Sequence, residues 1–375
     1  MKRLTIIDGN SLLFRAYYAS AYPGTTLMRT KDGIPTNAIY IFANMLVRIL
    51  ADIVPDDGLL VAFDTGAKTF RHQQLETYKA QRKKAPDELV AQMPIARELL
   101  SALGVFTFEM NGYEGDDVAG SAAFLAHRQG HEVHLYTSDR DFLQLVNTTI
   151  KVHLIKRGMS DIRIMNRDRV IEEYGLTPEQ IPDFKGLCGD ASDNLPGIPG
   201  IGEKTATKLL AEYGTFEAIL AQADAIGGKI GANLKEHQAI GALSKQLAII
   251  DTAMKLPFAL DDTVYHGYDF ETVTAFGARY ELKTFLTKLP TGWRVNQDAV
   301  ALEVREVASL SAFKHRGAVG LYFDAAGGNY HKNAVYGLAL SGTETTVYLS
   351  LEAARKDPAL LRFYATRPSP NTFTT

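Results

Sequence analysis

Short apolar runs alternate with longer amphipathic segments along the N-terminal half of the chain. Three apolar runs rich in β-branched and aromatic residues are typical of buried strands: residues 4–7, 58–63 and 132–137. Three segments have the apolar spacing of helices: residues 36–51, 86–103 and 116–129. Strands that alternate with helices predict an α/β fold, with a mostly parallel sheet flanked by helices and with right-handed connections.

The pattern changes after residue 150. Residues 149–155 and 161–165 predict a hairpin, and short helical pieces broken by Gly and Pro follow from about 168 to 255. Strand patterns return between residues 317 and 350, and the polar tail 365–375 is expected to be disordered. We therefore expect three regions: a catalytic core over 1–167, a helical subdomain over 168–290, and a linker with an incomplete α/β segment over 291–375.

Length and composition narrow the class of protein. The 375 residues exceed most single cores, and Cys188 is the only cysteine, which excludes disulfides and cysteine-rich zinc sites. Asp8 and Asn10 interrupt the first apolar run too early for a secretory signal, and no run approaches the 18 apolar residues of a membrane span. We expect a cytoplasmic, monomeric protein without a membrane partner.

Acidic residues follow each predicted strand. Strand ends and two further clusters supply nine candidate metal ligands: Asp8, Asp64, Glu114, Asp116, Asp117, Asp139, Asp141, Asp190 and Asp193. Since ligands bind beyond the carboxyl ends of parallel strands, these side chains should converge on one cleft. The alternative is that any single aspartate after a strand has only a structural role, as a turn or cap residue.

Crowded carboxylates need a counter-charge. Two like charges ~4 Å apart repel by about 4 kcal/mol at an effective dielectric of about 20. Oxygen-only ligands suit Mg²⁺ or Mn²⁺, and nine acids predict at least two ions. The formal net charge of −3 argues weakly against nucleic acid, but it would be +6 without these nine acids.

Two further segments indicate a phosphate-bearing polymer. Residues 195–210, "LPGIPGIGEKTATKLL", have the form of a helix-hairpin-helix turn, in which Gly200 and Gly202 allow close approach of phosphate and Lys204 and Lys208 follow on a helix. Such a turn binds the sugar–phosphate backbone of a nucleic acid and makes no contacts to the base edges. The alternative is an ordinary glycine-rich loop.

The second segment is a basic arm over residues 68–84, within a predicted arch at about 68–95. It contains candidate DNA contacts at Arg71, Tyr78 and Lys83, with Tyr78 offered as a stacking surface for an unpaired base. Arg15, after Asp8, is a further candidate phosphate contact. The alternative is a solvated helix face.

Six motifs together resemble one family. "IIDGNSLLFRAYYA", "VAFDTGAKTFRH", "YKAQRKKAPDEL", "GYEGDDVAG", "TSDRDFLQLV" and "GLCGDASDNLPGIPGIGEKTA" occur in order over about residues 1–290. They resemble the 5′-nuclease domains of the flap-endonuclease family, as found at the N-terminus of bacterial DNA polymerases I.

The resemblance implies a PIN-like sheet, a helical arch over the active site and a hairpin that grips duplex DNA. It implies that all nine acids bind Mg²⁺, that Lys79 and Arg82 steer and polarise the scissile phosphate, and that K⁺ binds near 197–202. It also implies that a proofreading-type domain begins after residue 290. The D-x-E of that domain's first strand here reads "LYFDAAGG", with Asp324 present and Ala326 in place of Glu, so we expect no activity from this segment.

The expected function is that of a metal-dependent, structure-specific 5′-nuclease acting on 5′ flaps and 5′ ends of DNA. Two rivals stay open: a PIN-type endoribonuclease with the same acidic cleft, and a DNA-junction binding module without catalysis. The hairpin and the basic arm argue against the first, and the completeness of the acid set argues against the second.

Overall fold

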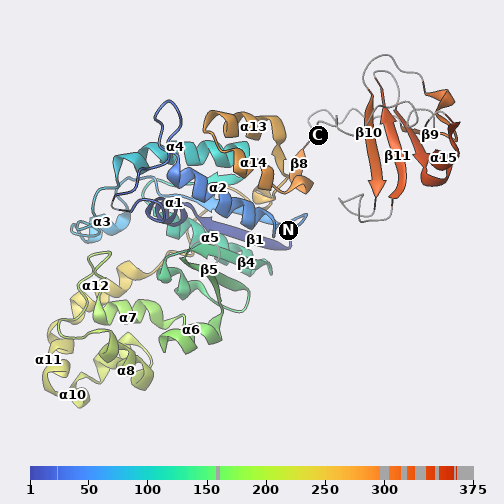
Figure 1. Cartoon of the computed structure of the whole chain (residues 1–375). Helices are drawn as coiled ribbons and strands as arrows, with labels where there is room; N and C mark the ends of the chain where they lie inside the picture. Colours follow the sequence, from blue (N-terminus) through green and yellow to red (C-terminus); the bar gives the residue numbers. More distant parts are fainter. Residues whose placement is uncertain are drawn as a thin grey trace. The chain divides into compact units, whose positions relative to one another are not determined.

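The computed structural model describes residues 1–22, 24–157, 161–295, 304–313, 319–325, 335–342, 346–358 and 360. The chain forms two compact units, Met1–Val295 and Asn296–Thr375. All candidate site residues belong to the first unit (Figure 1). Among the described residues, no helix combines the length and the apolar character needed to cross a membrane.

A six-stranded sheet with the order β3-β2-β1-β4-β5-β6 forms the centre of the first unit. Its strands are β1 (Arg3–Asp8), β2 (Gly58–Ala62), β3 (Phe106–Phe108), β4 (Glu132–Thr137), β5 (Ile150–Arg157) and β6 (Asp161–Met165). Every neighbouring pair is parallel except β5 and β6, which form the predicted antiparallel pair. The mostly parallel α/β fold is thus confirmed, and the strand order reverses between β1 and β4.

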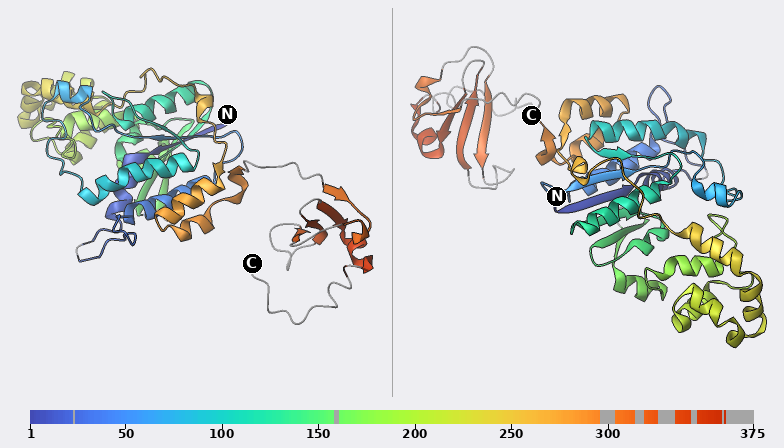
Figure 2. Two further views of the ribbon diagram at one scale, coloured as in Figure 1. Left: turned by 90° about the horizontal axis from the view of Figure 1, so that it is seen from above. Right: turned by 180° about the vertical axis from the view of Figure 1, so that it is seen from behind.

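Helices cover both faces of this sheet (Figures 1 and 2). One face packs against α5 (Gly115–Arg128). The other face packs against α1 (Gly9–Tyr18), α2 (Asn37–Leu50), α4 (Asp87–Ala102), α13 (Phe270–Arg279) and α14 (Lys283–Lys288). In β2, Leu60 and Ala62 enter the α5 core while Leu59 and Val61 enter the other, which is the period-two alternation of a strand buried on both sides.

A lobe of short helices follows the sheet, as the Gly- and Pro-broken pattern predicts (Figure 1). It contains α6 (Arg167–Tyr174), α7 (Gln180–Cys188), α8 (Glu203–Tyr213), α9 (Phe216–Ala221), α10 (Ala223–Ile226), α11 (Gly228–Glu236) and α12 (Gln238–Ala248). Its apolar residues continue the α5 core, since Leu135 of β4 and Leu210 of α8 belong to the same buried cluster. The helical lobe therefore shares one continuous core with the α5 side of the sheet, and its helix α7 packs on the 3₁₀ helix Arg140–Leu145 that follows β4.

The second unit has its own small sheet and core. Its sheet has the order β10-β11-β12-β9, from β9 (Val304–Glu306), β10 (Gly320–Ala325), β11 (Val335–Ser341) and β12 (Thr346–Ser350), and α15 (Leu351–Lys356) follows. Asp324 on β10 accepts a hydrogen bond from the Tyr348 hydroxyl at 2.9 Å. Ala326 and the tail after residue 360 lie outside the described residues.

Candidate active site

A cleft of about 1960 Å³ lies at the carboxyl ends of β1 and β4, between the sheet and the helical lobe. Six of the nine predicted acids line it: Asp8, Asp64, Asp116, Asp139, Asp141 and Asp190. The strand order reverses at this place, where open α/β sheets hold their ligands. The sheet therefore brings together acids that lie up to 182 positions apart in the chain.

Asp8 and Asp64 occupy fixed positions at two neighbouring strand ends. Asp8 caps α1 by accepting from the Ser11 backbone N–H at 3.0 Å, and its other oxygen accepts from the Thr137 hydroxyl at 2.7 Å. Asp64 accepts from the Asn10 amide at 2.9 Å and from the Gly115 backbone N–H at 2.6 Å. These bonds join Asp8 to the first turn of α1 and to the end of β4, and Asp64 to the first turn of α5.

The carboxylates at the base of the cleft repel one another. Burial, and then the charges of Asp139 and Asp64, raise the pKa of Asp8 to about 7. Burial, and then Asp8 and Asp139, raise the pKa of Asp116 well above its usual value. Asp8, Asp64, Asp116 and Asp139 thus form one electrostatic group, which we call the floor group.

A second acidic pair lies beside the floor group. Lys185 of α7 bridges it by donating to both Asp141 and Asp190. Burial, and then Asp139, raise the pKa of Asp141 to about 7, whereas Lys185 holds the pKa of Asp190 below its usual value although burial alone would raise it. The sequence around Lys185 carries no pattern that predicts this contact, because nothing distinguishes a helical lysine that points toward acids on another element from one that points to solvent.

The basic arm holds two more of the acids. Lys79 Nζ lies 2.8 Å from Glu114 Oε1, and Arg82 donates to Asp193 at 2.6 Å. Although burial alone would raise it, Lys79 and Arg82 hold the pKa of Asp193 below its usual value. Glu114 lines a smaller pocket of about 200 Å³ next to the cleft, together with Asp64, Lys79 and Arg82.

The prediction that Tyr78 offers a stacking surface is wrong. Its side chain is 2% exposed, and its hydroxyl donates to Glu114 at 3.2 Å and to Asp193 at 3.0 Å. The ring is therefore packed beneath the arm and is closed to a base. Lys83, by contrast, is exposed.

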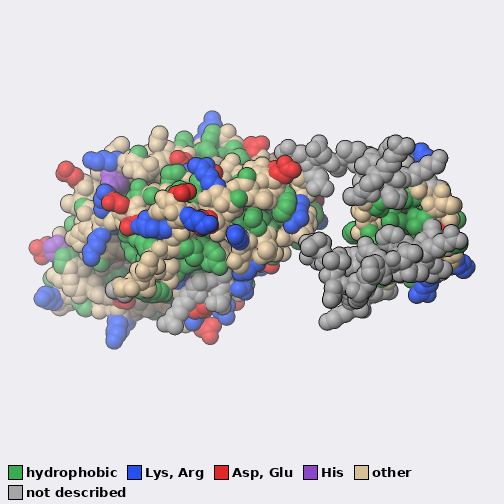
Figure 3. All heavy atoms as spheres, turned by 45° about the horizontal axis from the view of Figure 1, so that its top comes forward, with side chains coloured by type: hydrophobic (Ala, Val, Ile, Leu, Met, Phe, Trp, Pro, Cys, Tyr) green, Lys and Arg blue, Asp and Glu red, His purple; other side chains and the backbone are tan. Residues whose placement is uncertain are grey.

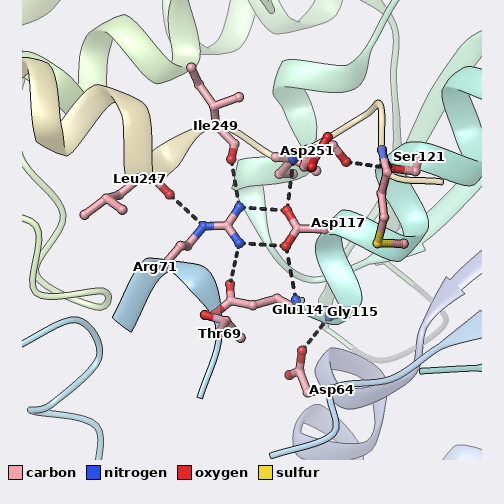
Figure 4. Close-up of polar contacts among 12 residues, drawn as sticks. Asp64, Thr69, Arg71, Glu114, Gly115, Asp117, Ser121, Leu247, Ile249 and Asp251 are labelled. Carbon is pink, nitrogen blue, oxygen red and sulfur yellow. Dashed lines mark hydrogen bonds and ion pairs between the residues drawn. The ribbon is translucent and has the colours of Figure 1, made fainter. Parts of the chain in front are cut away.

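The prediction that Arg71 contacts DNA is also wrong, because the residue is 2% exposed and its side chain points toward Asp117 (Figure 4). Its guanidinium binds both carboxylate oxygens of Asp117, each at 2.7 Å. Asp117 is 0% exposed and also accepts backbone N–H groups from Glu114 at 3.1 Å and Asp251 at 2.9 Å. Four donors fill its two oxygens, and it lies outside the cleft lining.

The glycine hairpin forms the opposite rim of the same cleft. Gly202 caps α8, and Gly202, Lys204 and Lys208 line the cleft, with all three exposed. Gly200, at the turn, has a φ of +78°, which favours glycine. Arg15 lines the cleft from α1, and its buried Nε has no hydrogen-bond partner.

Basic and acidic side chains lie beside one another on the face of the first unit drawn in Figure 3. Attraction of a polyanion by the overall charge is therefore weak, and local groups in the cleft must supply it. Arg15, Lys204 and Lys208 are cleft-lining cations for which no acidic partner within hydrogen-bonding distance is found in the described part of the chain.

The acids fit a hard divalent cation. They offer only oxygen, they are buried or half-buried, and burial together with their mutual repulsion raises the pKa of Asp8 and Asp116. Within the described ranges, no three His, Cys, Asp or Glu side chains lie close enough to hold an ion without rearrangement. Lys79, Arg82 and Lys185 form ion pairs with Glu114, Asp193, Asp141 and Asp190, so an ion that used these four acids would have to displace the three cations.

Curated relatives of the chain are bacterial DNA polymerases I. It is 40% identical over 363 residues to DNA polymerase I of Bacillus caldotenax, covering 95% of this chain and 40% of the relative. It is 42% identical over 256 residues to that of Mycobacterium tuberculosis, covering 68% of this chain and 28% of the relative. The chain thus spans less than half the length of the relatives it matches.

Solved structures show the same fold. T5 5′-exonuclease with bound zinc matches with a TM-score of 0.55 at 21% identity, covering 76% of this chain and 97% of that one. Flap endonuclease-1 from Methanococcus jannaschii matches with a TM-score of 0.50 at 15% identity, covering 76% and 91%.

Two family models match consecutive parts of the chain. One describes a 5′-3′ exonuclease N-terminal resolvase-like domain and matches residues 3–175, and the other describes a 5′-3′ exonuclease C-terminal SAM fold and matches residues 176–271. Together they span the sheet, the cleft and the helical lobe. The chain belongs to the 5′-3′ exonuclease family, of the type found in bacterial DNA polymerase I.

Proposed function

We propose that residues 1–295 form a Mg²⁺-dependent, structure-specific 5′-nuclease that cleaves 5′ flaps and 5′ ends of DNA. One observation carries this proposal: a single cleft presents the floor group on one side and Lys204 and Lys208 on the other. Acids alone would suit many phosphate-cleaving enzymes. A helix N-terminus with exposed lysines on the facing rim adds a place to hold a nucleic-acid backbone.

The acids divide into two candidate ion positions. The floor group of Asp8, Asp64, Asp116 and Asp139 would hold one Mg²⁺, and Asp141, Asp190 and Asp193 would hold a second after Lys185 and Arg82 move away. Mn²⁺ has the same ligand preference and would substitute. Divalent ions in such a site lower the pKa of water and neutralise the charge of a phosphodiester undergoing displacement.

The remaining groups bind and orient DNA. Lys204 and Lys208 would hold duplex phosphates at the rim, and Arg15 would use its unpartnered Nε on a phosphate nearer the floor group. Lys79 and Arg82, released from Glu114 and Asp193, would offset negative charge at the scissile phosphate. Lys83, at the exposed end of the arm, would add a contact to a DNA phosphate that salt screens.

K⁺ bound at the hairpin is a further element of the proposal. The Pro199 carbonyl accepts from the Asn233 amide at 2.7 Å and the Ile198 carbonyl accepts from the Ile201 N–H at 3.1 Å, so two carbonyls near 197–202 already have partners. Carbonyl oxygens have a second lone pair, which keeps the site open to an ion. Duplex affinity that is equal in KCl and LiCl at one ionic strength would remove K⁺ from the account.

A labelled 5′-flap substrate tests the proposal. We expect cleavage near the junction with Mg²⁺, none with a chelator, and recovery when Mg²⁺ is added back. An RNA flap of the same sequence should be cleaved more slowly; preferred cleavage of RNA would favour the endoribonuclease. Flap binding without cleavage at any Mg²⁺ or Mn²⁺ concentration would favour the non-catalytic junction-binding module.

A further inference from the structure

Arg71 and Asp117 form a buried ion pair that joins three segments of the chain (Figure 4). Arg71 belongs to α3 (Phe70–Gln74) at the base of the arm, and Asp117 belongs to the first turn of α5. The guanidinium and the carboxylate meet through two parallel hydrogen bonds, an arrangement that fixes orientation as well as distance.

The third segment is the end of α12. Arg71 Nε donates to the Leu247 carbonyl at 2.9 Å, and its NH2 group donates to the Ile249 carbonyl at 2.8 Å. The Asp251 backbone N–H, just after α12, donates a hydrogen bond to the Asp117 carboxylate. Arg71 thus satisfies carbonyls at the C-terminus of α12, which lack partners within the helix.

The same helix contacts the glycine hairpin. The Gly197 backbone N–H donates to the Ser244 hydroxyl of α12 at 3.1 Å. Gly241 of α12 packs so closely on Ile198 that an added Cβ would lie 2.8 Å from its side chain. One rigid helix therefore touches the hairpin along its length and Arg71 at its end.

On its other side, Asp117 fixes the backbone that presents the acids. It accepts the Glu114 N–H, which closes the first turn of α5. The next residue, Gly115, donates its N–H to Asp64. Glu114, Asp116 and Asp64 thus take their positions from a turn whose geometry Asp117 sets.

We propose that Arg71 and Asp117 are a positioning pair that aligns the first turn of α5 with the arm and the hairpin helix α12, and that Asp117 acts through Arg71 rather than as a metal ligand. This inference rests on the proposed nuclease function. Its basis is that all four acceptor positions of Asp117 are filled by donors within 3.1 Å. An ion would have to displace the pair that holds three segments together.

A double-mutant cycle with Asp117→Asn and Arg71→Met tests the pair. Asparagine turns an NH2 group toward donors on one side, and Met leaves the Asp117 charge buried and unpaired. Each single variant should cleave a flap about 100-fold more slowly at saturating substrate, as expected for misplaced catalytic groups, with KM within about threefold of wild type. When Arg71 is already Met, the further change Asp117→Asn should lower the cleavage rate by less than about tenfold, because it removes the carboxylate charge that the first change left unpaired.

Calorimetric titration with Mg²⁺ supplies a readout without turnover. We expect Asp117→Asn to bind Mg²⁺ within about threefold of wild type. Asp116→Asn, one position earlier, is the matched comparison and should bind at least about tenfold more weakly. Glu98→Gln, which breaks an exposed pair with Arg279, controls for loss of an ordinary ion pair and should leave cleavage unchanged.

Distinct outcomes overturn the two proposals. Equal losses of Mg²⁺ affinity in Asp117→Asn and Asp116→Asn would make Asp117 a ligand, and full additivity in the cycle would show that Arg71 and Asp117 act independently. Either result would end the positioning inference. If wild type cleaves no flap, the proposed function fails, and the titration still decides the role of Asp117. Arg71→Lys, which keeps the charge but loses the fork, replaces Arg71→Met in the cycle if the latter does not fold.

Discussion

Lys79 Nζ lies 2.8 Å from Glu114 Oε1, and the backbone N–H of the same lysine donates to the Asp193 carbonyl at 3.0 Å. Lys79 has a φ of +56°, a strained conformation for a residue with a side chain. The arm is thus held on two candidate metal ligands by one residue. In this arrangement the Lys79 ammonium is paired with the Glu114 carboxylate, so its charge is not available to a phosphate.

Replacing Lys79 should slow chemistry more than it disturbs the fold. Lys79→Met removes a cation next to the proposed scissile phosphate, and loss of one such stabilising group costs roughly 100- to 1000-fold in kcat. The check is single-turnover cleavage of a flap together with the melting temperature. Lys84→Met, which removes an exposed lysine paired with Asp87, is the control and should retain activity. A large fall in melting temperature with unchanged cleavage would make Lys79 structural.

Removing the rim lysines should weaken binding and leave chemistry intact. Lys204→Ala with Lys208→Ala should raise the Kd for duplex DNA and lower the slope of log K against log salt by about 2, since each phosphate contact contributes ~0.9. Cleavage at saturating DNA should change less than about threefold. Lys283→Ala, an exposed lysine of α14 outside the cleft, is the control. An unchanged salt slope in the double variant would place the duplex elsewhere.

Gly197 and Gly202 should respond differently to substitution. Gly197 has a φ of +61°, and an added Cβ would lie 2.2 Å from the Gly189 nitrogen, so Gly197→Ala should cost at least ~2 kcal/mol of folding stability. Gly202 faces open space and caps α8, so Gly202→Ser should change stability by less than ~0.5 kcal/mol. Urea denaturation measures both, and equal losses would contradict this account of the hairpin.

His153 should make the fold sensitive to mild acid. Burial, and then neighbouring charges, lower its pKa from 6.5 to about 3. The titratable and charged groups facing it come from three strands: Arg3, Glu132, His134, Tyr136 and Lys151. The unfolded chain therefore takes up a proton below pH 6.5 that the folded chain refuses until about pH 3, and stability falls as the pH falls through this window.

The expected loss from His153 between pH 7.5 and pH 5 is about 2 kcal/mol. His153→Phe keeps an aromatic ring against Tyr136 but removes the titratable imidazole. The variant should therefore lose correspondingly less folding stability between pH 7.5 and pH 5. Denaturant titrations at the two pH values provide the check. A parallel decline of wild type and variant would show that other groups cause the acid sensitivity.

The main strands were predictable because their apolar runs are buried on both faces. Strand β3, at the sheet edge, was not identified, since Phe106–Phe108 has only three residues and shows no usable alternation. The N-terminal strand β9 of the second unit is equally short and falls where a linker was expected. Short edge strands depend on their neighbours for hydrogen bonds, and a local pattern does not reveal these.

The acids were predictable as a set because they follow strands that share one edge. Their individual roles were not, as Arg71 and Tyr78 show. A basic segment beside a cleft looks the same in sequence whether a side chain turns outward to phosphate or inward to a buried carboxylate. Only the packing of the α12 end on α3 and α5 determines that Arg71 turns inward.

Calorimetric titration of the metal-free chain with Mg²⁺ tests the central claim most directly, namely that the strand-end acids hold divalent ions. Asp8→Asn with Asp139→Asn removes half of the floor group, and Asp324→Asn in the second unit is the matched control. We predict uptake of Mg²⁺ by wild type and by the control, and at least about tenfold weaker uptake by the double variant. Identical affinity and stoichiometry in all three proteins would contradict the account.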